Sequence, residues 1–225
     1  MFTPFTPQTS EFIWELMFNN SREWFAPRKE DYERLWGGPF KALARETLSL
    51  MQERHPERSW SVHVSRIYRD ARRLFGRGPF KDHLWFTITD GDERACPPVL
   101  WFEMGAAEYA YGMGQYDATP EMMEKFRRSI DANPARFEAL ARQAAALEGF
   151  HIDGESYKRP KGDPGGVLTP WYNLKRPGLE RKLPFGGDLY DPRLPEILAD
   201  SYEKLLPLYD YLREIYNTCQ QGEKK

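Results

Sequence analysis

Apolar residues recur at helical spacing in the first fifty residues of the chain and again after residue 119. A first helix is predicted to begin at Thr9 or Ser10, where a hydroxyl can cap the free N–H groups. A second is predicted to begin at Ser21 and to end at the "GGP" of residues 37–39. Pro39 would then occupy the first position of a third helix.

Three later helices are predicted from capping residues that are each followed by proline. These residues are Thr119, Asn133 and Asp191. Proline suits the first helical turn because its missing N–H would have no partner there. The last of these helices contains Pro207, which is predicted to kink or split it.

Between the helical ends, apolar and polar residues alternate as they do in strands. The connections are too short for helical crossovers, so an antiparallel meander is expected. The strand-like segments are "WSVHVSRIY" from Trp60, "HLWFTIT" from His83, "PPVLWFEMG" from Pro97 and "EYAYGMG" from Glu108. The glycines of the last segment indicate a tight turn rather than a phosphate loop, because the other residues of a phosphate-loop motif are missing.

The fold class predicted from these elements is α+β, with an antiparallel meander sheet and N-terminal and C-terminal helices packed on it. We expect a single domain over residues 1–217 and a disordered tail over residues 218–225. The stretch 149–187 is rich in Gly, Pro and basic residues, and is interpreted as irregular loops with two or three short strands that lie over the sheet.

Composition excludes several classes of protein. The 225 residues carry a formal net charge of −2, so there is no global electrostatic case for nucleic-acid binding. Cys96 and Cys219 form no C-x-x-C pair, and the histidines show no metal-ligand spacing, so no metal and no cofactor is predicted. No signal peptide and no apolar run of membrane-spanning length is recognised, which favours a cytoplasmic protein.

One segment, residues 65–86, departs from this balanced composition because basic residues dominate it. Guanidinium groups match phosphate and carboxylate oxygens bidentately, so the segment is a candidate anion site. The candidate ligand-binding residues are Arg66, Arg69, Asp70, Arg72, Arg77, Lys81 and His83, with Arg73 also in the basic cluster. The alternative is an ion-pair network with acidic helical residues, which are Glu23, Glu30, Asp31 and Glu33.

Asp70 lies between Arg69 and Arg72 and is interpreted as the residue that orients one or both of them. A general base is the alternative, but neighbouring arginines lower the pKa of a carboxyl away from the value a base needs. His63 and His83 lie near the same segment, where an imidazole is suited to acid–base chemistry, but the favoured interpretation of each is a satisfied or exposed histidine without such a role. A second basic group in the late loops is expected to approach the first; its members are Lys158, Arg159, Lys161, Lys175, Arg176, Arg181 and Lys182.

Two motifs resemble a known family, the domain-of-unknown-function 2461 group of conserved hypothetical proteins. "NNSREWFAPRKEDYERLWGGPF", from Asn19, resembles its signature N-N-x-R-E-W-F, then D-Y-E, then P-F. The segment from Arg66 to Lys81 is similar to the family's R-x-x-R-D-x-R-F-S-K-D-K-T-P-Y-K, although residues 73–76 depart from F-S-K-D. The resemblance implies one compact domain with a shared site, and it implies no reaction.

Two classes of function remain open at this point. The first is a binding protein or enzyme whose basic pocket holds a phosphorylated or carboxylated small molecule. The second is a non-catalytic module for a protein or nucleic acid, and a purely structural Arg/Asp network is a further alternative. Specific nucleic-acid binding is not expected at physiological salt, since the chain is slightly acidic. A concave pocket would favour the small molecule, and a flat basic face the module. The oligomeric state is not predicted.

Overall fold

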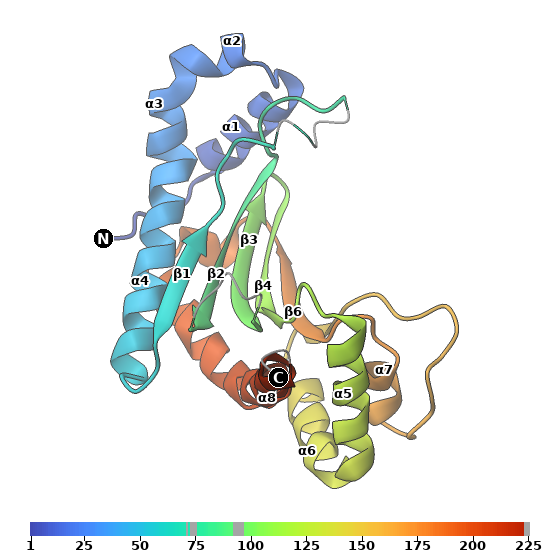
Figure 1. Ribbon diagram of the computed structural model, residues 1–225. Helices are drawn as coiled ribbons and strands as arrows, with labels where there is room; N and C mark the ends of the chain where they lie inside the picture. The colour runs from blue at the N-terminus through green and yellow to red at the C-terminus, as the bar shows by residue number, and fades with distance from the viewer. Residues whose placement is uncertain (71, 73–75, 92–96, 223–225) are drawn as a thin grey trace. The chain divides into compact units, whose positions relative to one another are not determined.

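The computed structural model describes residues 1–70, 72, 76–91 and 97–222 (Figure 1). Arg73 and Cys96 lie outside the described residues. The order of elements is helices, then strands, then a mixture of both, which confirms the predicted α+β class. No helix in this described part of the chain combines the length and the apolar character that crossing a membrane requires.

The N-terminal helices form an almost unbroken run. Helix α1 (Pro7–Phe18) is followed by α2 (Arg22–Phe25), η1 (Ala26–Arg28), α3 (Lys29–Tyr32), the π-helix η2 (Glu33–Gly37) and α4 (Gly38–Arg54). Ser21 caps α2 as predicted, since its hydroxyl accepts from the N–H of Trp24 at 3.2 Å.

Two predicted boundaries in this region are wrong. The first helix begins at Pro7, and Thr9 lies inside it, where its hydroxyl donates to the carbonyl of Leu35 at 2.9 Å. The "GGP" of residues 37–39 does not end a helix, because Gly37 and Gly38 both have right-handed helical dihedral angles. Pro39 occupies the first turn of α4, where a missing N–H costs no helical hydrogen bond.

The sheet has six strands in the order β1-β2-β3-β4-β6-β5. The first four follow one another as the predicted antiparallel meander, and the structure confirms all four segments. Their bounds are Trp60–Val64 for β1, His83–Asp90 for β2, Val99–Gly105 for β3 and Glu108–Gly114 for β4. Alternate residues of these strands, such as Leu84 and Phe86, are buried, and Phe40 of α4 packs on Phe86 and Phe102.

The late basic stretch extends the sheet instead of lying over it. Strands β5 (Phe150–Asp153) and β6 (Gly178–Pro184) pair antiparallel and join the meander through β4. The turn predicted at Gly112 is therefore wrong, because Gly112 lies inside β4. A Cβ at Gly112 would lie 2.0 Å from the carbonyl oxygen of Leu179, so only glycine permits this close approach of the two backbones.

The remaining helices are α5 (Pro120–Ala132), α6 (Pro134–Ala145), α7 (Leu168–Tyr172), η5 (Gly187–Tyr190) and α8 (Leu194–Gly222). Helix α8 continues through Pro207, so of the two predicted outcomes the split does not occur, and the kink stays a prediction. A proline inside a helix costs about 3 kcal/mol. The buried Leu205, Leu206 and Leu208 each contribute about 1.5–3 kcal/mol, which outweighs that cost.

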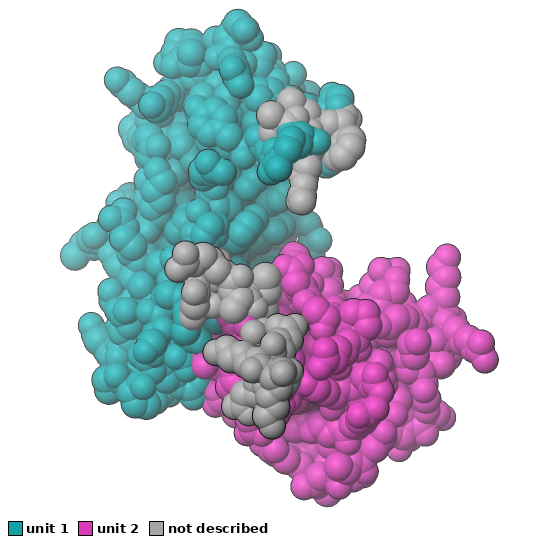
Figure 2. Space-filling view, viewed as in Figure 1, with its two compact units in different colours: residues 1–91, 101–110, 182–200 teal, residues 92–100, 111–181, 201–225 magenta. Residues whose placement is uncertain are grey.

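The residues pack into two compact units, shown in Figure 2. Unit 1 comprises Met1–Gly91, Trp101–Ala110 and Lys182–Asp200; unit 2 comprises Asp92–Leu100, Tyr111–Arg181 and Ser201–Lys225. Helix α8 continues to Gly222, so residues 218–222 of the predicted tail are helical, and residues 223–225 lie outside the described part. A single domain over residues 1–217 stays a prediction.

Candidate functional site

The candidate site is built on the connection between β1 and β2, which Figure 1 shows extending past the sheet towards α1 and α2. The two strands keep pairing beyond their ends, because Tyr68 and Phe80 form an antiparallel bridge. Between this bridge and the pair Val64–Phe86, the first strand has three residues and the second has five. The second strand therefore bulges, and its extra residues include Asp82 and His83. Bulges of this kind redirect side chains and are common beside active sites.

The N-terminal signature anchors this connection through Asn20. The side-chain amide of Asn20 donates to the carbonyl of Phe80 at 3.0 Å, and its oxygen accepts from the N–H of Phe80 at 2.9 Å. A Cβ on Gly78 would lie 2.3 Å from the Asn20 side chain and 2.4 Å from its carbonyl, so glycine is required there. Arg69 adds a third bond, because its Nε donates to the same Phe80 carbonyl at 2.8 Å.

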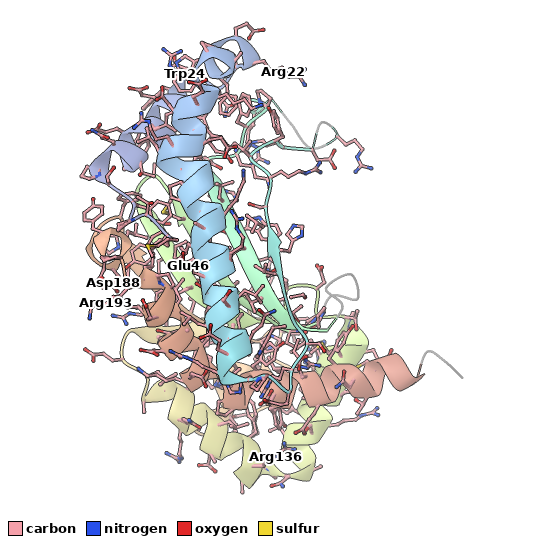
Figure 3. All side chains as sticks on the ribbon, turned by 90° about the vertical axis from the view of Figure 1, so that its left-hand side faces the viewer. Arg22, Trp24, Glu46, Arg136, Asp188 and Arg193 are labelled. Carbon is pink, nitrogen blue, oxygen red and sulfur yellow. The ribbon has the colours of Figure 1, made fainter. Side chains whose placement is uncertain are left out.

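Aromatic packing completes the anchor. The ring of Phe25 in α2 stacks on Phe80 with 4.2 Å between centroids, and Tyr68 covers Phe80 from another side at 5.2 Å. Figure 3 labels Trp24 and Arg22 on the same short helix. Trp24 packs on Phe12 of α1. The two motifs that carry the family resemblance therefore meet in space, and the first holds the second in place.

The structure brings all seven predicted site residues to one cavity of about 870 Å³ within unit 1. We call this the basic cavity. Four further residues line it that the sequence did not single out as ligands: His63, Ser65, Tyr68 and Trp85. A volume of this size is typical of sites for small molecules.

Two of the five cations in the lining are paired with carboxylates. Arg69 is largely buried, with 13% of its side chain exposed, and its Nη2 lies 3.0 Å from Asp82 Oδ1. Arg72 is 88% exposed and forms a bidentate pair with Asp70, at 2.7 Å and 3.1 Å. Asp70 thus orients Arg72, as predicted for one of the two arginines, while Arg69 is held by Asp82.

The other three cations are Arg66, Arg77 and Lys81. Among the described residues, no carboxylate lies within 4.0 Å of their cationic groups. Burial, followed by the charges of Arg66 and Arg69, lowers the pKa of the Lys81 ammonium. The like charges of Arg66 and Arg69 therefore disfavour the charged form of the Lys81 ammonium.

Two of the four acidic helical residues proposed as alternative partners, Asp31 and Glu33, are engaged elsewhere. Asp31 pairs with Arg34 at 2.6 Å, and Glu33 pairs with Lys41 at 3.1 Å. These pairs lie within the N-terminal helices, so they do not neutralise the basic cavity.

The imidazole of His83, which lines the cavity, is bonded to the carboxylate of the residue before it, Asp82. Asp82 Oδ1 lies 2.9 Å from His83 Nδ1, a bond that favours a proton on Nδ1. Burial opposes ionisation of Asp82, but its own backbone N–H, the neighbouring His83 and Arg69 outweigh burial and lower its pKa. On β3, burial raises the pKa of Glu103, with His83 opposing the shift. The imidazole of His83 therefore lies in the lining of the cavity with the ionised carboxylate of Asp82 bonded to it.

Aromatic rings form the other part of the lining. His63 and Trp85 stack with 5.3 Å between centroids and 26° between planes. His63 pairs with Thr87, and Trp85 lies two residues before Thr87 on the same face, so His63 and Trp85 are diagonal neighbours. The two strands stay paired here, because the Ser65 N–H donates to the Trp85 carbonyl at 2.8 Å. Lys81 Nζ lies 5.6 Å from the centroid of Trp85, so the cationic and aromatic parts of the lining are continuous. Strand alternation from His83 predicts Trp85 on this face.

The second basic group does not line the basic cavity. Several of its members have partners nearby: Lys175 pairs with Glu155 at 2.8 Å, Lys161 lies over Tyr157, and Arg176 lies over Tyr116. Lys182 pairs with Glu108. The second basic group therefore contributes no residue to the lining of the basic cavity.

In the described ranges, no three or more His, Cys, Asp or Glu side chains are arranged to hold a metal ion.

These features define an α+β protein with an arginine-rich cavity at the outer end of a β-hairpin, anchored by N-terminal helices. The family model described as "Conserved hypothetical protein (DUF2461)" matches residues 8–211. The chain belongs to this DUF2461 family, as its two motifs indicate. The comparison with curated proteins gave no match.

Proposed function

We propose that the protein binds a phosphorylated or carboxylated small molecule in the basic cavity. The observation that carries this proposal is the convergence of Arg66, Arg77 and Lys81 on one cavity without a carboxylate partner among the described residues. Guanidinium and ammonium groups of this kind bind phosphate oxygens through charge-assisted hydrogen bonds. The concave shape favours a small molecule over a flat interface for a protein or a nucleic acid.

A structural ion-pair network accounts for Arg69 and Arg72 but not for Arg66, Arg77 and Lys81, which have no carboxylate partner in the described part of the chain. Natural proteins retain destabilising charge clusters mainly where function requires them. The proposal concerns binding, and it is compatible with catalysis by the Asp82–His83 pair on the bound molecule. A cytoplasmic location belongs to the proposal too, because the part of the chain that the structure describes has a free thiol at Cys219.

The proposal is tested by calorimetric titration of sodium phosphate into the protein and into two variants of equal charge. Lys81→Gln removes a cation of the cavity, whereas Lys29→Gln removes an exposed cation of α3. Since a hydrogen bond to a charged group contributes about 1.5–3 kcal/mol, Lys81→Gln is expected to weaken phosphate binding about tenfold or more.

Lys29→Gln is expected to bind phosphate like the parent protein. Without ligand, Lys81→Gln is expected to be at least as stable as the parent, because repulsion from Arg66 and Arg69 is relieved. Absence of saturable phosphate binding by the parent protein, or equal binding by Lys81→Gln, would refute the proposal.

A further inference from the structure

The basic cavity is larger than an anionic group requires, and its lining is not uniformly basic. Its volume of about 870 Å³ leaves room for a ligand well beyond one phosphate. The residues that face this room next to the cations are aromatic: Trp85, His63 and Tyr68. A purely electrostatic phosphate site has no need of these rings.

The rings are placed beside the cations in a defined order. Lys81 has Arg66 and Arg69 as its charged neighbours, and its Nζ lies over the ring of Trp85. An anionic group held by these cations would therefore lie next to the Trp85 ring. Lys81 thus lies between the two arginines, Arg66 and Arg69, and the stacked pair of Trp85 and His63.

Tyr68 supplies a second aromatic surface. Its side chain contacts Phe25 edge-on at 6.4 Å and Phe80 at 5.2 Å, and the residue is 51% exposed although both rings beneath it are buried. An aromatic side chain that is fixed from below and exposed above is a platform for stacking. Base stacking on such side chains tolerates any base, since every base has a π-face.

We propose that the ligand of the basic cavity is a mononucleotide, whose phosphate binds Arg66 and Lys81 and whose base stacks on the aromatic side chains next to Lys81. This proposal rests on the proposed function, because it requires the anion site. A free mononucleotide is favoured over a nucleic-acid strand because the stacking surfaces line a concave cavity and the chain as a whole is slightly acidic.

The experiment compares three ligands by calorimetric titration: adenosine 5′-monophosphate, ribose 5-phosphate and inorganic phosphate. The mononucleotide is expected to bind at least fivefold more tightly than ribose 5-phosphate, which is the low end of the base-stacking range. Equal affinities for all three would overturn the mononucleotide proposal and leave the anion site intact. If none of the three ligands binds, the anion site itself is refuted.

Variants locate the stacking surface. Trp85→Leu is expected to lower the affinity for the mononucleotide to that for ribose 5-phosphate. Trp85→Phe is expected to retain part of the preference. Trp101→Leu, on β3 and outside the cavity lining, is the matched control and is expected to retain all of it.

A fourth ligand, a 5′-phosphorylated single-stranded hexanucleotide, distinguishes the free mononucleotide from a strand. It is expected to bind no more tightly than adenosine 5′-monophosphate. Tighter binding of the hexanucleotide would contradict the commitment to a free mononucleotide. A Trp85→Leu variant that keeps the full mononucleotide preference would contradict the stacking surface.

Discussion

Asn20 offers the sharpest test of how the site is held together, because its side chain bonds both backbone groups of Phe80. In Asn20→Ala, the Phe80 carbonyl still accepts from Arg69 Nε, at 2.8 Å in the parent protein. The Phe80 N–H loses the acceptor that Asn20 provides. Phe80 is 1% exposed, so this donor is left buried without that partner.

One orphaned buried donor costs about 1–3 kcal/mol, whereas two orphaned groups would cost about twice as much. For a protein of this length, the midpoint of thermal unfolding is expected to fall by about 2–12 °C. Phosphate binding is expected to weaken at the same time, because Phe80 directly precedes Lys81. Differential scanning calorimetry measures the first effect and titration calorimetry the second.

The neighbouring asparagine is the matched control. Asn19 is exposed, and its side chain donates only to the Glu15 carbonyl at the end of α1. Asn19→Ala is expected to change the unfolding midpoint by less than half as much as Asn20→Ala, and to leave phosphate binding intact. The reasoning is refuted if both variants unfold at the same temperature.

Two further predictions concern the charged groups. The lowered pKa of Asp82 means that its ionised form stabilises the fold above the ordinary value of 3.8, and that this contribution is lost as the pH falls through the folded pKa. Urea unfolding of Asp82→Asn should therefore show a deficit at pH 7 that shrinks below pH 3.8, and an equal deficit at both pH values would contradict it. For the arginines, Arg69→Ala is expected to cost about 1.5–3 kcal/mol because Arg69 is buried and bonded to Asp82 and Phe80. Arg72→Ala, which removes an 88% exposed side chain, is expected to leave the unfolding midpoint unchanged, and the reverse order would be inconsistent with this assignment.

Much of the fold is readable from local sequence. The alternation of β2 places Leu84 and Phe86 in the core and His83 and Trp85 on the other face, so both the strand and its polarity are predictable. The proline-marked starts of α5 and α6 are local signals too. Whether Pro207 splits α8 is not readable in this way, because the burial of its neighbours keeps the helix continuous and depends on tertiary packing.

The residues of the candidate site were predictable as a set, but the hydrogen bonds and ion pairs that hold them were not. Basic density in one segment identified the cations of the cavity. The partner of Arg69 depends on a bulge that places Asp82 beside it, and alternation alone does not predict a bulge. The bond from Asn20 to Phe80 spans sixty positions, and nothing local to either residue signals it.

The central claim, an anion held by the basic cavity, is tested most directly by the crystal structure of the protein soaked in sodium tungstate, a heavy analogue of phosphate. The account predicts an anomalous peak within hydrogen-bonding reach of Arg66 and Lys81, and its loss in Lys81→Gln crystals. A protein that shows no peak in the cavity, or shows one only elsewhere on its surface, would contradict the account.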